Sequence, residues 1–226
     1  MPVLFEVTRA WKAAFPGAHA GVLVMQNATN PASHADLERS KEALMAALRQ
    51  RYGGLDRRQL LALPALQVYD EYYQRFKKTY HVQLQLESIV FKGKSIPSVA
   101  VLVEAMFMAE IKNMLLTAGH DLDTLQMPIR LGVTRGDEVY TLMHGQPQQV
   151  KPGDMFISDG RGIMSNIIYG PDQRTQIQPA TRNVIYTTYA PAGIAVSSIT
   201  RHLKDIEGYV RMVSPQARTE LMQVFG

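Results

Sequence analysis

The stretch DMFISDGRGIMSNIIYG, residues 154–170, sets the architecture of the second half of the chain. Two short runs that mix apolar and polar residues, 154–159 and 162–170, flank the glycine-rich segment SDGRG. Strands place successive side chains on opposite faces, and a glycine-rich turn between two such runs is typical of a hairpin. We therefore predict a β-hairpin here.

Similar runs surround this hairpin, separated by Gly, Pro and Asp turns at a spacing of about 8 to 12 residues. They are IRLGVT (129–134), EVYTLMHG (138–145), TQIQ (175–178) and NVIYTTYAP (183–191). Between the first two, Arg135-Gly136-Asp137 predicts a second hairpin. The pattern predicts a small antiparallel sheet packed on a second sheet.

The first half of the chain is predicted to be mainly helical, after a buried strand that begins at Gly21. The most apolar helix is VAVLVEAMFMAEIKNMLL (99–116), where Glu104 and Glu110 lie six residues apart on different faces and so make a poor catalytic acid pair. The other predicted helices are 33–54 with Ser33 as N-cap, 63–81, 81–93, one capped near Ser197 or Ser198, and a tail helix after Pro215. The fold class is therefore α+β, with helices packed on a β-sandwich.

Length and composition indicate one domain over residues 1–226, in which 1–96 is mostly helical and 97–226 holds the core helix, the sandwich and C-terminal helices. There is no cysteine, which excludes disulfides, thiolate metal sites and cysteine nucleophiles. No apolar run reaches membrane-spanning length. Glu6, Arg9 and Lys12 interrupt the segment where a signal peptide needs an apolar core, so we expect a cytoplasmic protein.

Positive charge is concentrated in the first part of the chain. Residues 1–96 hold 13 Lys and Arg against 8 Asp and Glu, whereas residues 97–226 hold 11 against 12. This excess indicates either phosphate binding or a solvated helical surface. Within it, four aromatic residues share one helix face beside basic residues, a pattern that fits core packing or stacking on nucleic-acid bases. The four are Tyr69, Tyr72, Tyr73 and Phe76.

No familiar catalytic motif is present. The chain lacks a GxSxG elbow, a GxxxxGK[ST] loop and a GxGxxG turn after a strand. The run His120-Asp121-Leu122-Asp123 contains metal-ligand types, but without partners elsewhere it favours a turn in which Asp121 or Asp123 binds backbone amides. We therefore expect no metal and no cofactor.

The segment DQRTQIQPATRN, residues 172–183, gathers two arginines and two threonines at the start of a strand. Arginine binds carboxylate or phosphate in a bidentate fork, and threonine both donates and accepts hydrogen bonds. Arg174, Thr175, Thr181 and Arg182 therefore indicate a recognition surface for an anionic or aminoacyl group. The alternative is that the threonines are ordinary strand residues and the arginines form ion pairs with Asp172 and Asp159.

The order of several motifs resembles the free-standing relatives of the B3/B4 domain, the tRNA-binding and editing domain of the phenylalanyl-tRNA synthetase beta subunit. The resemblance covers nearly the whole chain. The motifs are FPGAHAGVLV, IPSVAVLVEAMFMAEI, AGHDLDTL, PIRLGVTRGDEVYTL, VKPGDMFISD and QRTQIQPATRNVIY. It implies a three-layer fold in which helices cover a β-sandwich of unusual topology.

The resemblance also implies a function. In the synthetase this domain hydrolyses tyrosine wrongly attached to the phenylalanine tRNA, and free-standing relatives look like trans-editing factors. It implies tRNA or aminoacyl-tRNA as partner, with no membrane and no DNA involved. It places the 172–183 segment beside an amino-acid pocket, with Asp121, Asp123 and Asp159 as structural anchors.

The chain departs from the family pattern at the predicted pocket. Ala100-Val101 replaces Asn-Pro, Phe107 replaces a helix Asn, Ala118 replaces a pocket histidine and Gln173 replaces a pocket glutamate. Two titratable groups are lost, and His120 lies two residues from the lost histidine.

Two functions follow as hypotheses, besides the possibility of an interaction module whose pocket is a relic. The first is aminoacyl-ester hydrolysis on tRNA, in which Gln173 and Thr181 orient the ester or a water and Arg174 or Arg182 holds phosphate. Thr175, His120 and Phe107 complete the predicted substrate-binding residues. The second is non-catalytic binding of an amino acid or small anionic metabolite in the same pocket.

Overall fold

The computed structural model describes residues 4–226. Its helices are α1 Arg9–Ala14, α2 Ala35–Tyr52, α3 Arg57–Leu61, α4 Pro64–Gln74, α5 His81–Lys92, α6 Val101–Asn113 and α7 Val196–Val213, with a 3-10 turn at Leu122–Thr124. Its strands are β1 Phe5–Val7, β2 His19–Gln26, β3 Leu116–Asp121, β4 Ile129–Val133, β5 Val139–Thr141, β6 Pro147–Gln149, β7 Met155–Asp159, β8 Gly162–Asn166, β9 Gly170–Pro171, β10 Val184–Ala190 and β11 Arg218–Phe225. The α+β class predicted from the sequence is confirmed.

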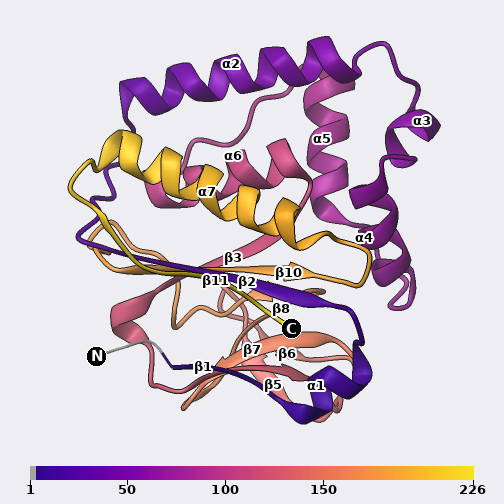
Figure 1. Cartoon of the computed structure of the whole chain (residues 1–226), viewed down its shortest axis with the longest axis vertical. Coiled ribbons are helices and arrows are strands. Elements are labelled where there is room, and N and C mark those ends of the chain that lie inside the picture. The colour runs from indigo at the N-terminus through magenta and orange to yellow at the C-terminus, as the bar shows by residue number, and fades with distance from the viewer. Residues whose placement is uncertain (1–3) are drawn as a thin grey trace.

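Two sheets face each other, and helices cover the outer face of one of them (Figure 1). One sheet has the strand order β11-β2-β10-β3, and the other has the order β1-β4-β7-β8-β9. Helices α6 and α7 lie on the first sheet, with α2 above them (Figure 1). The predicted pair of packed sheets is therefore present. The second sheet is mixed, because β1 pairs parallel with β4.

Helix α6 lies against β3 and is buried on almost every side, as the apolar stretch 99–116 predicts. Glu104 at its start accepts a hydrogen bond from Lys41 of α2 at 3.0 Å, and this buried ion pair ties the two helices together. Glu110 points to a different side, so the prediction that the two carboxylates lie apart is consistent with the structure.

The four aromatic residues on the predicted helix face are buried, which confirms the core interpretation. Tyr69 stacks on Tyr80 with ring centroids 4.4 Å apart. The basic neighbours Lys77 and Lys78 are exposed, and the guanidinium of Arg75 lies over three of the core rings. The helix itself ends earlier than predicted, at Gln74, because Lys77 adopts a positive φ.

The predicted hairpin over residues 154–170 is confirmed, since β7 pairs antiparallel with β8. The hairpin predicted at Arg135-Gly136-Asp137 is wrong. Strand β4 pairs with β1 and β7, whereas β5 pairs with β6. The Glu138 carboxylate accepts the N–H groups of Arg135 and Gly136, and this local turn closes without pairing its flanking strands.

Three further sequence expectations are corrected. The tail after Pro215 is strand β11, which pairs antiparallel with β2 at a sheet edge, rather than a helix. The segment 175–178 is a loop, in which the Thr175 N–H bonds the Asp172 side chain and the Thr175 carbonyl accepts the N–H of Asp121 at the end of β3. The predicted serine caps are also wrong, since α2 and α7 begin after His34 and Ala195 with no side-chain cap.

None of the helices described in residues 4–226 has the length and apolar character needed to cross a bilayer.

Candidate functional site

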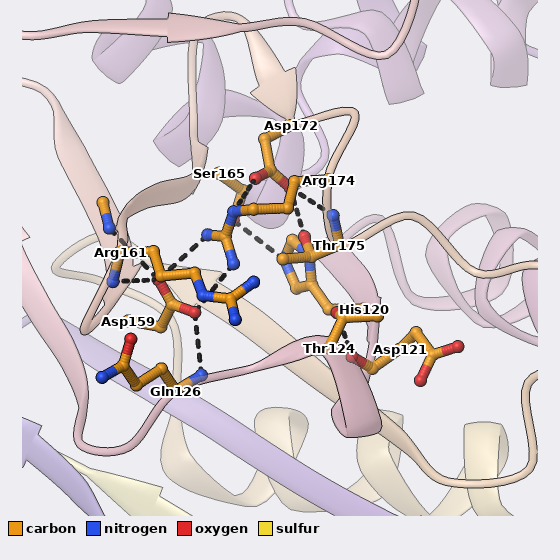
Figure 2. A network of polar contacts seen from close by, with 11 residues as sticks. His120, Asp121, Thr124, Gln126, Asp159, Arg161, Ser165, Asp172, Arg174 and Thr175 are labelled. Carbon is orange, nitrogen blue, oxygen red and sulfur yellow. Dashed lines mark hydrogen bonds and ion pairs between the residues drawn. The ribbon is translucent and has the colours of Figure 1, made fainter.

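A network of polar side chains joins the end of β7 to the loop after β9 (Figure 2). At its centre the Asp159 carboxylate, which is buried, accepts both guanidinium N–H groups of Arg174 at 2.9 Å. It also accepts the backbone N–H groups of Gln126 and Arg161, each at 2.9 Å, and of Gly162 at 3.2 Å. Five donors around one carboxylate fix three segments of chain against one another.

These donors determine the charge of Asp159. Burial by itself raises the pKa of this carboxyl, but the hydrogen bonds from Arg174, Gln126 and Arg161 outweigh burial and lower its pKa below the usual value. The carboxylate is therefore ionised and paired. Arg174 also lies 3.4 Å from the Asp172 carboxylate, so the ion-pair interpretation of this arginine is confirmed.

His120 is a core residue on β3, linked to the same network (Figure 2). The Thr175 hydroxyl donates to Asp172, so the same hydroxyl accepts from His120 Nδ1 at 2.7 Å. His120 Nε2 lies 3.2 Å from the Ser165 hydroxyl. Burial, followed by the nearby charge of Arg174, lowers the pKa of His120 to about 3. The ring is neutral at physiological pH and both of its nitrogens have partners.

The segment 181–183 is held by the acidic turn that follows β3. The Thr181 hydroxyl donates to Asp121 and accepts the Gln178 N–H at 2.9 Å. Asp121 also accepts the N–H of Asp123 at 3.0 Å, which confirms the predicted turn. Within residues 4–226 no three His, Asp or Glu side chains are grouped to hold a metal ion.

The predicted recognition residues do not converge on one hollow. The hydroxyls of Thr175 and Thr181 point to carboxylates, and Arg174 is paired. Arg182 is exposed, and its Nη1 binds the carbonyls of Pro179 and Thr181. Gln173 is exposed beside a separate hollow of about 330 Å³ that Arg161 and Arg174 also line. The contribution of these residues to substrate binding or catalysis stays a prediction.

An apolar cavity of about 220 Å³ lies between α6, β3 and the β8–β9 region. Phe107, predicted to contact substrate, lines it from α6, and Ala118, which the sequence resemblance aligns with a pocket histidine, lines it from β3. The opposite wall is formed by Asn166, Ile167 and Pro171, and the loop residue Ile177 adds a further side. The cavity thus lies where two sheet edges meet a helix.

Glu110 places a carboxyl group in this apolar wall. Its Oε1 accepts the Thr117 N–H at 2.7 Å, and its other oxygen has no hydrogen-bond partner within residues 4–226. Burial raises the pKa of Glu110 to about 8, and the single hydrogen bond from Thr117 opposes this only in part. At neutral pH the group is mainly the uncharged acid, which can donate as well as accept.

Asn166 contributes a hydrogen-bond donor without a partner. Its Oδ1 accepts the Tyr169 N–H at 2.8 Å, which fixes which end of the amide is nitrogen. The buried Nδ2 has no hydrogen-bond partner among the described residues. A buried unsatisfied donor costs about 1 to 3 kcal/mol.

No motif in the sequence indicated Glu110 or Asn166 as an individual site residue. The sequence did contain a signal for Glu110, because glutamate is rarely buried without a partner and this one lies inside the most apolar helix. Asn166 gave no signal, since its unsatisfied amide depends on partners that only the folded chain defines.

Comparison with known proteins gives only distant structural likeness. No protein-family model matches the chain, and no curated protein matches it. A solved N-terminal fragment of the phenylalanyl-tRNA synthetase beta-subunit from Pyrococcus horikoshii superposes with a TM-score of 0.48 and 9% sequence identity. The alignment covers 99% of this chain and 50% of that fragment, so the chain spans about half its length. A likeness this distant assigns no activity, substrate or partner to the chain.

Proposed function

We propose that the protein binds an apolar amino acid whose carboxyl group is in an ester or an amide. The ligand would lie in the cavity between α6, β3 and the β8–β9 region. The observation that carries the proposal is a mainly apolar cavity that Asn166 lines, a residue whose buried Nδ2 has no hydrogen-bond partner within residues 4–226. Apolar pockets with a few placed polar groups are the usual form of small-ligand sites.

The size of the cavity limits the ligand. A volume of about 220 Å³ exceeds the roughly 150 Å³ of an engineered apolar cavity that holds benzene. One aromatic ring or branched aliphatic side chain fits, together with a few polar atoms. Met106 and Phe107 provide the apolar contacts on the α6 side.

The charge of the cavity favours an ester or amide over a free acid. Neither lysine nor arginine lines it, and burial lowers the pKa of His81, which keeps that ring neutral. A carboxylate buried there would lack a cation, whereas a neutral carbonyl can accept from Asn166. An amino group of the ligand near Glu110 could accept the proton of its carboxyl group, which would form an ammonium–carboxylate pair.

The order of motifs in the sequence extends this proposal to aminoacyl-tRNA. An amino acid esterified to RNA presents a neutral carbonyl and an apolar side chain, the chemistry that this cavity accommodates. We infer transfer RNA as the carrier of the ligand, and the free amino acid as the weaker alternative.

A thermal-shift experiment tests ligand binding. The methyl esters and amides of phenylalanine and leucine should stabilise the protein, and the free acids should do so far less. A ligand at 100 times its dissociation constant adds about 2.7 kcal/mol. Ala118→Leu fills the cavity and should abolish the shift, whereas Ala46→Leu, on the exposed face of α2, adds the same carbons and should leave it unchanged. Equal shifts with acids and esters would reject the proposed ligand class.

Ester hydrolysis is a second candidate function, favoured by Glu110. A carboxyl group whose pKa is about 8 exchanges protons near neutral pH, as a general acid or base requires. The predicted residue Thr181 has its hydroxyl occupied by Asp121, and Gln173 lies outside the cavity lining. Their proposed orienting role would therefore need the loop 172–183 to move.

Deacylation of tyrosyl-tRNA that carries the phenylalanine anticodon measures this activity. Glu110→Gln should lower the rate by about 10²- to 10⁴-fold, the usual contribution of a general acid or base. The wild-type rate should rise with pH toward about 8 if the carboxylate acts as the base. A wild-type rate equal to that in buffer rejects hydrolysis and leaves the binding proposal standing.

A further inference from the structure

A second, larger hollow lies between the helices. It is an open groove of about 610 Å³ bounded by the end of α2, the start of α4, the end of α6 and the start of α7. It shares no lining residue with the cavity. Its lining is more polar than that of the cavity.

The lining of this groove is positively charged. Arg51 from α2, Lys112 from α6 and Arg201 from α7 reach it, and no aspartate or glutamate lines it. Lys112 is paired with Asp205 at 2.7 Å, which lies outside the lining. Neither Arg51 nor Arg201 forms an ion pair within residues 4–226, so two guanidinium groups remain available to an anion.

Local contacts hold both arginines close to the groove. The guanidinium of Arg51 lies 5.1 Å from the ring centre of the buried Tyr52, a cation–π contact that limits its movement. Arg201 lies one turn from Ser198, and its Nη2 is 3.4 Å from the serine hydroxyl. Guanidinium groups bind phosphate oxygens in a bidentate fork.

Two helix N-termini lie beside the same groove. Residues at the N-termini of α4 and α7 line the groove, and neither helix has a side chain that caps its first turn. The N–H groups of a first turn have no partner inside the helix and favour anions. Among the groove-lining residues, however, Pro64 has no N–H and Ser198 donates its N–H to the Ala195 carbonyl, so the two arginines are the main anion-binding groups.

We propose that this groove binds the phosphate groups of a nucleotide or of an RNA strand, through Arg51 and Arg201. Phosphate esters supply compact negative charge with several acceptor oxygens, which two guanidinium groups match. The proposal is independent of what the apolar cavity binds.

Binding of three probes to the full chain tests this proposal: tripolyphosphate, adenosine monophosphate and a labelled single-stranded RNA. The variant Arg51→Gln/Arg201→Gln should weaken binding at least tenfold and lower the salt dependence of RNA binding by about one unit for each lost phosphate contact. The control variant Arg9→Gln/Arg58→Gln removes two exposed arginines elsewhere and has the same net charge as the Arg51→Gln/Arg201→Gln variant. It should bind the probes as the wild type does.

The three probes also separate the sources of phosphate. Binding of all three identifies a site for phosphate itself, and binding of RNA alone identifies a site that needs the strand. If none binds, or if both double variants lose the same affinity, the proposal is overturned. The thermal-shift experiment with amino-acid esters and Ala118→Leu does not depend on whether these phosphate probes bind. The groove proposal can therefore fail while the cavity proposal stands, and the reverse also holds.

Discussion

Asp159→Ala is expected to lower the free energy of unfolding by about 3 to 5 kcal/mol, the range for breaking a buried ion pair from one side. The carboxylate of Asp159 holds the Arg174 guanidinium and three backbone N–H groups, and the substitution leaves all of them without their acceptor. Arg174 is about one-third exposed, so water can compensate part of its loss.

Urea unfolding measures this effect. Asp137→Ala is the matched control, because Asp137 pairs with Arg135 at the surface and both side chains are largely exposed. That control should change the stability by less than about 0.5 kcal/mol. A change of the same small size for Asp159→Ala would show that the network in Figure 2 does not hold the β7–β9 region together.

Glu110→Gln is expected to remove a pH dependence of stability on the order of 4 kcal/mol. Burial raises the pKa of Glu110 from 4.5 to about 8, so between these values the folded state holds a proton that the unfolded state has lost. The wild type is therefore most favoured below about pH 4.5 and loses stability as the pH rises to about 8. Glutamine is neutral at every pH, so the variant lacks this loss.

Unfolding free energies at a series of pH values from 5 to 8.5 test the expectation. The variant should be close to the wild type at the acidic end and progressively more stable than it toward the alkaline end. Glu42→Gln changes an exposed glutamate on α2 and should follow the wild type throughout. Parallel curves for Glu110→Gln and the wild type would show that Glu110 ionises as freely in the folded protein as in the unfolded one.

The parts of the fold that sequence could predict are those fixed by local patterns. The hairpin over residues 154–170 has its turn and both strands within 17 consecutive residues, and α6 lies within one apolar run. Strand β11 could not be predicted in the same way. Its pairing partner β2 lies nearly two hundred residues earlier, and its short sequence suits a helix equally well.

The candidate site was only partly predictable for the same reason. Arg174, Thr175 and His120 do lie together, but their partners Asp159 and Asp172 take up their polar groups. Whether a hydroxyl faces a ligand or a carboxylate depends on the packing of distant strands, which spacing along the chain does not encode. Phe107 and Ala118, placed by the resemblance, do line the cavity.

One measurement tests most directly whether the apolar cavity is the ligand site. Protein labelled at its alanine, methionine and isoleucine methyl groups is mixed with phenylalaninamide, and nuclear Overhauser contacts from the ligand ring are recorded. The account predicts contacts to the methyl groups of Ala118, Met106 and Ile177, which line the cavity. Contacts confined to methyl groups outside that lining, or none at saturating ligand, would contradict it.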